Sequence, residues 1–512
     1  PEVAHLPDLR TLSALEGGGP LGLVRHFLAE VGPDPDVVVV DGLVAPRLLA
    51  SEGVEGAHVE LPELLVLLGL ADLSQLQRIG ALSRVDALRV ISRTSTLAAR
   101  DGSRSVGEIA RELGVDAVVE GSVVRAEDRV RIQLQLVQIH PDERHLWAET
   151  FERELDDVLR VHGEVAEAVA REIRGHVSAR GEERLARVRR VNPAMYDAYL
   201  RGVHHLGKFT PEGLERGLEY LHRAIEEDPA DPLPYAALAL AHSQIGHESG
   251  EPEKHFPRAR EAAERALAID DTLAEAHEAI AETKLYWEWD WEGAEAAFDR
   301  ALTLNPSLAV AHAHRGWYLH LRRRWEEGTD EMRTAEELDP LVPLYPAWRG
   351  WQLLLMGRAE EALEAARRAL ELQSDFPVGL YVLGAVHAAR GSVDDALDAH
   401  RKAGTASPDW AWGLGHTLAL AGREEEAREV ATRIESSLTP MTPFGLAVIH
   451  AELGETDEAF RWLEAAFESR FSWMPWMAVY PTLSSLHDDP RYAEMVSRLD
   501  LPEPWEPASV SA

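Results

Sequence analysis

Side chains that could bind a metal ion or transfer a proton are numerous in this chain, but their spacing builds no familiar site. The 512 residues include 22 histidines and no cysteine. No two histidines are three or four residues apart, the separation that places two ligands on one helical face. His204 with His205, and His312 with His314, point in different directions. We therefore expect no metal site within a single helix, and a site assembled from distant helices stays open.

Other catalytic patterns are also missing. The sequence has no GxxxxGK phosphate loop, no GxGxxG motif after a strand and no GxSxG elbow. Gly17 to Gly19 have no lysine after them and are read as a linker. The paired acids Asp394 and Asp395 lie at a predicted helix start, where they complement the helix dipole rather than act as general acid and base. We predict a protein without catalytic residues and without a cofactor.

A repeat of 34 residues organises the middle of the chain. Small residues return at this spacing in three series: Ala294, Gly328, Ala362 and Ala396; Ala301, Ala335, Ala369 and Ala403; and Gly316, Gly350 and Gly384. Small residues suit the close approach of two antiparallel helices, and Pro306, Pro340 and Pro408 follow the second helix, where a missing N–H ends it. This is the tetratricopeptide (TPR) period, in which helix pairs stack into a curved array. The predicted fold is mainly α, a TPR-type α-solenoid with an N-terminal α/β (α+β) domain.

The solenoid is expected to span residues 192–470 with about eight helical pairs. Their second helices are anchored at Gly217, Ala259, Ala294, Gly328, Ala362, Ala396, Ala427 and Ala459. Ala224 and Ala266 are 42 residues apart, so the second pair holds about eight extra residues, which we place in a polar turn from Gly246 to Pro257. Ala266 and Ala301 are 35 apart, and the extra residue is expected near the tryptophans of residues 287–291, at a turn between helices.

The concave face of such a solenoid is lined by first helices and usually binds protein segments. Projecting the repeat onto the sequence places nine side chains there: Glu278, Glu282, Tyr286, Trp317, His320, Trp351, Tyr381, Trp412 and His416. Rings at regular intervals suit an extended peptide, because each offers a large contact area at little entropic cost. Glu275, with Glu278 and Glu282, would favour a basic segment. The alternative is that the rings pack between helices of the array or against the N-terminal domain.

Residues 73–157 predict a small domain that combines helices and strands, whereas residues 1–72 form a poorly assigned N-terminal α/β segment with one buried strand at Val37–Val40. Alternation of apolar and polar residues indicates an antiparallel sheet covered by helices on one side. The expected elements are a helix over residues 76–85, a strand over Leu88–Ser92, a helix over Val106–Leu113 ending at Gly114, and strands over Ala117–Val124, 130–136 and His145–Thr150, with a turn through residues 126–128.

Three stretches of this domain resemble the TolB-like amino-terminal domain: ALRVISRTST (Ala87–Thr96), ELGVDAVVEGSVVRAEDRVRIQLQLVQ (Glu112–Gln138) and HLWAETFEREL (His145–Leu155). In bacterial regulators that domain commonly lies between an upstream output module and a TPR array. The resemblance covers roughly residues 73–175 and implies an architecture but no catalytic residue. Residues 37–72 are longer than the usual opening of that family and place their loop residues differently. We therefore expect the first part of the domain to differ in structure from the family.

Two further segments flank the solenoid. Residues 158–191 predict a charged connecting helix whose mixed arginines and glutamates suit solvated ion pairs better than a basic handle for a partner. Residues 471–512 predict a capping segment and tail, with an apolar stretch over Phe471–Tyr480 and a helix from Pro490 capped by Asp489. This helix should cover the end of the last pair, because open-ended solenoids need polar caps. Phe467–Tyr492 also resembles the tail that closes repeat arrays in the same regulators.

Composition excludes several partners. The net charge of −36 disfavours direct nucleic-acid binding. The longest apolar stretch near the start, residues 61–73, contains Pro62, Glu63 and Asp72 and is shorter than the ~20 residues that span a bilayer. The lack of cysteine fits a reducing cytoplasm, so we predict a cytoplasmic protein without membrane contact. The chain begins at Pro1 without a basic leader, and we expect it to be a processed or excised piece of a longer protein.

Three functions follow as hypotheses from different classes. The first is a non-catalytic scaffold or regulatory protein that binds a protein or peptide in its concave groove. The second is the sensory, effector-binding part of a larger transcriptional regulator, adenylate cyclase or protein kinase. The third is a hydrolase with a dispersed metal site, which the spacing of the histidines disfavours. The sequence leaves the partner and the oligomeric state open.

Overall fold

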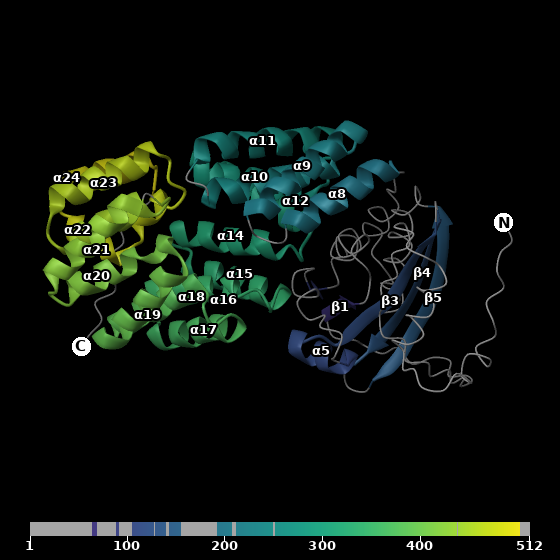
Figure 1. Ribbon diagram of the computed structural model, residues 1–512, viewed down its shortest axis with the longest axis horizontal. Coiled ribbons are helices and arrows are strands. Elements are labelled where there is room, and N and C mark those ends of the chain that lie inside the picture. The colour runs from purple at the N-terminus through teal and green to yellow at the C-terminus, as the bar shows by residue number, and fades with distance from the viewer. Residues whose placement is uncertain are drawn as a thin grey trace.

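The structure, a computed structural model, describes residues 64–68, 89–91, 105–126, 129–139, 143–154, 192–206, 211–248, 251–437 and 439–501. Within these ranges a small sheet domain precedes a long curved array of helices, coloured from teal to yellow in Figure 1. Several expected elements lie outside the described residues: the strand at Val37–Val40, the helix over residues 76–85, the connecting helix over residues 158–191 and most of the turn at residues 126–128.

The N-terminal domain contains a five-stranded sheet of mixed direction. Its strands are β1 (Leu64–Leu68), β2 (Arg89–Val90), β3 (Ala117–Ala126), β4 (Arg129–Gln138) and β5 (Arg144–Glu154), in the order β2-β1-β3-β4-β5. The β3–β4 and β4–β5 pairs are antiparallel, as the alternation predicts. β1 pairs in parallel with both β2 and β3, so the sheet is not antiparallel throughout. β1 also shows that the sheet extends into the segment 1–72.

Helix α5 (Val106–Leu113) confirms the expected helix and its end. Ser105 caps it and forms a capping box with Glu108, whose carboxylate accepts the backbone N–H of Ser105 at 2.7 Å. Gly114 ends it in the left-handed conformation, with φ 64°, which glycine adopts without steric cost. The apolar face of α5 contributes Ile109 and Leu113 to the buried core of this domain.

Eight helical pairs follow Asn192 and form the TPR-type α-solenoid that the 34-residue period predicts. The first helices are α8 (Pro193–Leu206), α10 (Leu233–Glu248), α12 (Ala274–Glu282) with the π-helix η2 (Thr283–Glu288), α14 (Ala309–Leu321), α16 (Leu344–Leu355), α18 (Pro377–Ala389), α20 (Trp412–Leu420) and α22 (Thr442–Glu452). The second helices are α9 (Pro211–Glu227), α11 (Pro252–Ile269), α13 (Trp291–Leu304), α15 (Trp325–Leu338), α17 (Ala359–Leu372), α19 (Val393–Ala406), α21 (Glu424–Ser437) and α23 (Thr456–Glu468). None of the helices in the described ranges is long and apolar enough to cross a membrane.

The recurring small residues let the two helices of a pair touch through their backbones. A Cβ added to Gly316 in α14 would lie 2.8 Å from the carbonyl oxygen of Gly328 in α15, and one added to Gly328 would lie 2.7 Å from that of Gly316. Gly384 makes a different contact, because its missing side chain leaves room for the His400 ring. The small-residue series therefore marks the close approaches that hold each pair together.

The two irregular spacings have different structural outcomes. The extra residues of the second pair lengthen its helices to 16 residues in α10 and 18 in α11, against 13 and 14 in α14 and α15. The prediction of a long polar turn from Gly246 to Pro257 is wrong, because most residues of that range belong to the end of α10 or the start of α11. The single extra residue of the third pair is absorbed by η2, where the chain forms a π-helix before the left-handed Trp289, with φ 59°.

The C-terminal segment contains a final α-helix, which covers the last pair, and two short 3-10 helices before it. Helix α24 (Pro490–Arg498) begins as predicted, with the Asp489 side chain accepting the backbone N–H of Arg491 at 3.0 Å. It lies against α23, where Arg498 forms an ion pair with Glu464 at 2.7 Å. Before it lie two short 3-10 helices: η4 (Met474–Ala478), whose residues are all buried, and η5 (Pro481–Leu486), which adds Leu483 and Leu486 to the main core.

Candidate functional site

Five of the nine predicted groove residues form a row of rings, which we call the aromatic row. They come from five consecutive pairs: Tyr286, Trp317, Trp351, Tyr381 and Trp412. Neighbouring rings touch along the last four, with centroid distances of 5.9 Å for Trp317–Trp351, 5.1 Å for Trp351–Tyr381 and 4.8 Å for Tyr381–Trp412. Each ring is at most 4% exposed. The row is therefore covered rather than open.

The cover is the chain's own residues 471–486, which we call the inner segment. Three of its aromatic side chains meet the row: Trp473 stacks on Trp351 at 5.1 Å, Trp476 stacks on Tyr286 at 5.8 Å, and the hydroxyl groups of Tyr480 and Tyr381 share a hydrogen bond of 2.9 Å. Trp476 also meets the Trp317 ring edge-on at 5.7 Å. The row thus contacts one continuous segment of chain across five repeats.

Local sequence explains how the inner segment reaches this position. Pro475 and Pro481 lie at the starts of η4 and η5, where their fixed φ suits the first turn. Met474 and Met477 are completely buried, and flexible methionine side chains fill irregular gaps well. The hydroxyl of Tyr492 in α24 donates to the carbonyl oxygen of Met477 at 2.5 Å. The final helix therefore anchors the segment that precedes it.

Two predicted groove residues lie away from the inner segment. His320 is fully buried between α14 and α15, with Nδ1 3.3 Å from the carbonyl oxygen of Gly316, and burial lowers its pKa to about 3. His416 is half-buried on α20, with Nε2 3.7 Å from a carboxylate oxygen of Glu452 in α22. Both side chains therefore lie in contacts between neighbouring helices.

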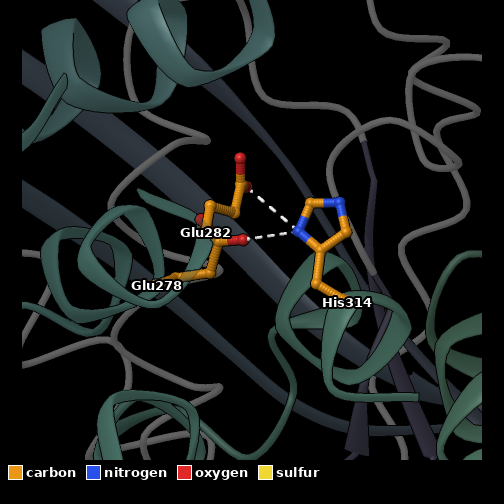
Figure 2. A group of neighbouring side chains, drawn as sticks. All are labelled: Glu278, Glu282 and His314. Atoms are coloured by element: carbon orange, nitrogen blue, oxygen red, sulfur yellow. Dashed lines mark hydrogen bonds and ion pairs between the residues drawn. The ribbon is translucent and has the colours of Figure 1, made fainter. Parts of the chain in front are cut away.

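The remaining two predicted residues, Glu278 and Glu282, form a buried cluster with His314 (Figure 2). The glutamates are four residues apart on α12, so they lie on one helical face, and His314 comes from α14 of the next pair. The Nδ1 atom of His314 is 2.9 Å from Oε1 of Glu278 and 3.0 Å from Oε1 of Glu282. We call these three residues the Glu–Glu–His cluster.

Burial and mutual charge set the protonation of the cluster. Burial, together with the charge of Glu282, raises the pKa of Glu278 well above its ordinary value. Burial acts in the same direction on Glu282, but the His314 charge together with hydrogen bonds from neighbouring side chains overcomes it and holds the pKa of Glu282 well below its usual range. For His314 burial opposes the positive charge, and the two carboxylates overcome it and raise the pKa to about 10. The cluster therefore holds a buried ion pair beside a protonated carboxyl group.

Aromatic rings and one further histidine surround the cluster. His247, at the end of α10, has Nε2 3.5 Å from Oε2 of Glu282. The Tyr286 ring meets His247 edge-on at 4.4 Å and His314 at 5.6 Å. The Trp348 ring lies 5.7 Å from His314. Tyr286 thus belongs to both the aromatic row and the wall of the cluster.

Sequence reasoning missed His314, His247 and the role of the inner segment. A search for two histidines on one helix cannot find a cluster whose acids lie on one helix and whose histidine lies on the next repeat. The inner segment carried a usable signal, because Trp473, Trp476 and Tyr480 are spaced by three and four residues in an apolar stretch. That pattern indicates a buried face but not which surface buries it.

Comparison with known proteins gives one match in sequence. No protein-family model matches the chain. A protein of Rhizobium meliloti (strain 1021) named "Putative adenylate cyclase 3" is 31% identical over 202 residues, which cover 39% of this chain and 34% of that protein. The chain therefore matches about a third of the length of this relative.

Solved structures with similar coordinates have low identity and low TM-scores. The APC/C hetero-tetramer Cut9-Hcn1 has a TM-score of 0.41 at 16% identity, covering 67% of this chain and 63% of that one. PilW, a type IV pilus biogenesis factor, has a TM-score of 0.37 at 15% identity, covering 44% and 100%. YrrB, described as a TPR protein with an unusual peptide-binding site, has a TM-score of 0.28 at 20% identity, covering 40% and 97%. The repeat architecture of this chain is established by its own eight helix pairs.

Proposed function

We propose that this chain is a non-catalytic, protein-binding helical-repeat part of a regulatory protein, and that it binds through the aromatic row. The observation that carries the proposal is the seating of the inner segment, whose three rings contact a row built from five successive repeats. The row is thereby suited to a short aromatic protein segment. A partner segment with rings at the spacing of Trp473, Trp476 and Tyr480 would take the place of the inner segment.

A partner can replace the inner segment only if it binds the aromatic row strongly or if the contacts of the inner segment are first weakened. A partner of the same kind recovers the apolar contacts that the inner segment gives up, so the net contact energy changes little. The inner segment, however, is tethered, and short tethers hold their ligand at an effective concentration of about 1 mM. A partner at micromolar concentration must therefore bind about 1,000-fold more tightly than the inner segment.

A peptide experiment tests whether the row accepts a segment supplied from outside. A synthetic peptide of residues 471–486 is titrated into the full chain and into its Trp476→Ala variant. Loss of a buried tryptophan weakens the inner segment by about 3–5 kcal/mol, so the peptide should bind the variant at least ~10-fold more tightly than the unmodified chain. Equal affinity for both proteins, or binding to neither, would count against the row as a binding surface.

Two further variants separate the row from general destabilisation. Trp462 lies on α23, half-buried under the Arg461 guanidinium at 4.1 Å and outside the row. Trp462→Ala should therefore leave peptide binding at the unmodified level. Adding Trp351→Ala to Trp476→Ala should abolish binding while the helical circular dichroism signal stays, because Trp351 stacks on Trp473 of the incoming segment.

A more specific candidate is the effector-binding part of a nucleotide cyclase. The observation that favours it is the 31% identity over 202 residues with the Rhizobium meliloti protein. In such a cyclase the helical array would bind a partner, and this binding would change the activity of a separate catalytic domain. The cytoplasm would be the compartment, because the nucleotide substrate is made there.

Reading the gene upstream of the codon for Pro1 tests this candidate. A cyclase catalytic domain in the same reading frame would support it. A winged-helix or kinase domain there would replace it with another class of regulator, and a secretion signal would contradict a cytoplasmic regulator altogether.

A further inference from the structure

The Glu–Glu–His cluster has the donor set of a divalent metal site. Two carboxylates and one imidazole offer oxygen and nitrogen ligands of the kind that Zn²⁺ and similar ions accept. Their ligand atoms all lie within 4.8 Å of one another, and all three residues are buried. We propose that Glu278, Glu282 and His314 bind a single divalent transition-metal ion of the Zn²⁺ class.

The geometry needs only a small adjustment. Zn²⁺ binds nitrogen and oxygen at about 2.0–2.2 Å, so tetrahedral ligand atoms lie roughly 3.3–3.6 Å apart. His314 Nδ1 is already 2.9 and 3.0 Å from the nearer oxygens of the two glutamates. Outward shifts of about 0.4 Å would open the coordination sphere, which is within the reach of side-chain rotation in a cluster drawn from two helices.

A buried oxygen without a partner belongs to the same cluster. Glu278 is completely buried, and its second oxygen, Oε2, has no hydrogen-bond partner among the described residues. Buried carboxylate oxygens are normally paired, because desolvation without a bond is costly. As the second oxygen of a chelating carboxylate, Glu278 Oε2 would supply a fourth ligand atom in a distorted site, because the two oxygens of one carboxylate lie closer together than ideal tetrahedral ligands. A divalent ion would also neutralise the two carboxylates beside a neutral imidazole.

His247 acts as a positioning residue for this site. Its Nε2 atom lies 3.5 Å from Oε2 of Glu282, the oxygen that does not face His314. Nε2 of His247 has no hydrogen-bond partner among the described residues, so a small shift would let it hold Glu282 by an outer hydrogen bond. Metal-binding carboxylates are usually held in this way, and loss of the outer partner costs about 10–100-fold in affinity. His247 lies on α10, Glu282 on α12 and His314 on α14, so the ion would tie together three consecutive pairs.

The site would be structural rather than catalytic. Three side chains supply four ligand atoms, and the rings of Tyr286 and Trp348 line the remaining approach. Catalytic zinc sites keep one position open for water or substrate, whereas closed sites stabilise the fold. This inference is independent of the proposed function, since binding of a peptide to the aromatic row does not require the ion.

Zinc binding to the full chain tests the proposal. The purified chain is stripped with a chelator, titrated with Zn²⁺ alone and analysed for bound metal after dialysis. One equivalent should be retained, and Glu282→Gln and His314→Asn should each weaken binding at least ~10-fold, as loss of even an outer partner does. His247→Gln should weaken binding by about 10–100-fold without removing a ligand.

The matched control is Glu331→Gln. Glu331 also accepts from a histidine, with His312 Nδ1 at 2.5 Å, but no second carboxylate of the described residues shares that imidazole, whose Nε2 lies 3.0 Å from the carbonyl oxygen of Pro306. Its variant should bind zinc as tightly as the unmodified chain. Because the cluster variants could misfold, X-ray absorption of the zinc-loaded unmodified chain gives a second readout, with one imidazole and only nitrogen or oxygen ligands expected. No retained zinc, or equal affinity in all variants, would overturn the site.

Discussion

At the scale of single residues, the same side chain takes opposite charge states according to what surrounds it. His314 faces two carboxylates, which raise its pKa to about 10. His400 is also buried, but its Nδ1 lies 2.8 Å from the Thr417 hydroxyl and its Nε2 lies 3.1 Å from the carbonyl oxygen of Tyr381. Burial lowers the pKa of His400 to about 3. Histidine count therefore says little about function until the partners of each ring are known.

The neutral histidines predict a loss of stability in mild acid. His320 and His400 have folded-state pKa values of about 3, whereas an unfolded histidine titrates near ~6.5. Between these values the unfolded chain binds more protons, so stability falls as the pH drops from ~6.5 towards ~3, by up to ~1.4 kcal/mol per pH unit for each histidine. Urea unfolding midpoints at pH 7 and pH 5.5 should show this decline.

His400→Gln isolates one of these contributions. Glutamine can still bond to Thr417 and to the Tyr381 carbonyl, but it does not titrate. The variant should lose less stability than the unmodified chain between pH 7 and pH 5.5. An identical decline in both proteins would show that His400 is not held neutral in the fold.

At the scale of elements, the small residues of the repeat carry much of the packing between helices. The Gly316–Gly328 contact joins α14 and α15 through their backbones, so an added methyl group meets atoms that cannot move aside. Gly328→Ala should therefore destabilise the chain by about 1–3 kcal/mol despite the better helix propensity of alanine. Thermal unfolding followed by circular dichroism measures the loss.

Gly107→Ala provides the comparison for this prediction. Gly107 is the second residue of α5, and a Cβ built there meets no atom of the described residues within 4 Å. Alanine should be neutral or slightly stabilising, because it fits this position without strain and restricts the unfolded chain more than glycine does. If Gly328→Ala were as harmless as Gly107→Ala, the close backbone approach would not be a determinant of the pair.

The sequence predicts contacts between neighbouring elements better than contacts between distant ones. The 34-residue period and the cap at Asp489 led directly to the helix pairs and to the start of α24, because both depend on nearby residues. The extra residues of the second pair were predicted to lie in a turn, but they lengthen the two helices. The number of residues between repeats does not distinguish these two arrangements. The inner segment was read only as part of a cap, because its contacts, such as Tyr381 with Tyr480, span 99 residues.

At the scale of the whole molecule, the C-terminal segment connects the third helical pair to the end of the array. The Trp291 Nε1–H donates to the carbonyl oxygen of Leu499 at 2.8 Å, and the Arg470 guanidinium donates to the carbonyl oxygen of Trp287 at 3.1 Å. Residues from the third pair are thereby fastened to the end of the array, and the inner segment lies between these fastenings. Its release is expected to loosen contacts across several repeats together.

Hydrogen exchange of the inner segment shows whether the aromatic row can release this segment and bind another in its place. The Trp476→Ala chain is incubated with excess peptide of residues 471–486, and amide exchange is followed by mass spectrometry, which separates the chain's own segment from the peptide by the substitution. The account predicts faster exchange in residues 471–486 of the chain when the peptide is present, while α16 and α18 stay protected. Unchanged exchange in that segment at saturating peptide would contradict it, because the aromatic row would then be a closed core and not a binding surface.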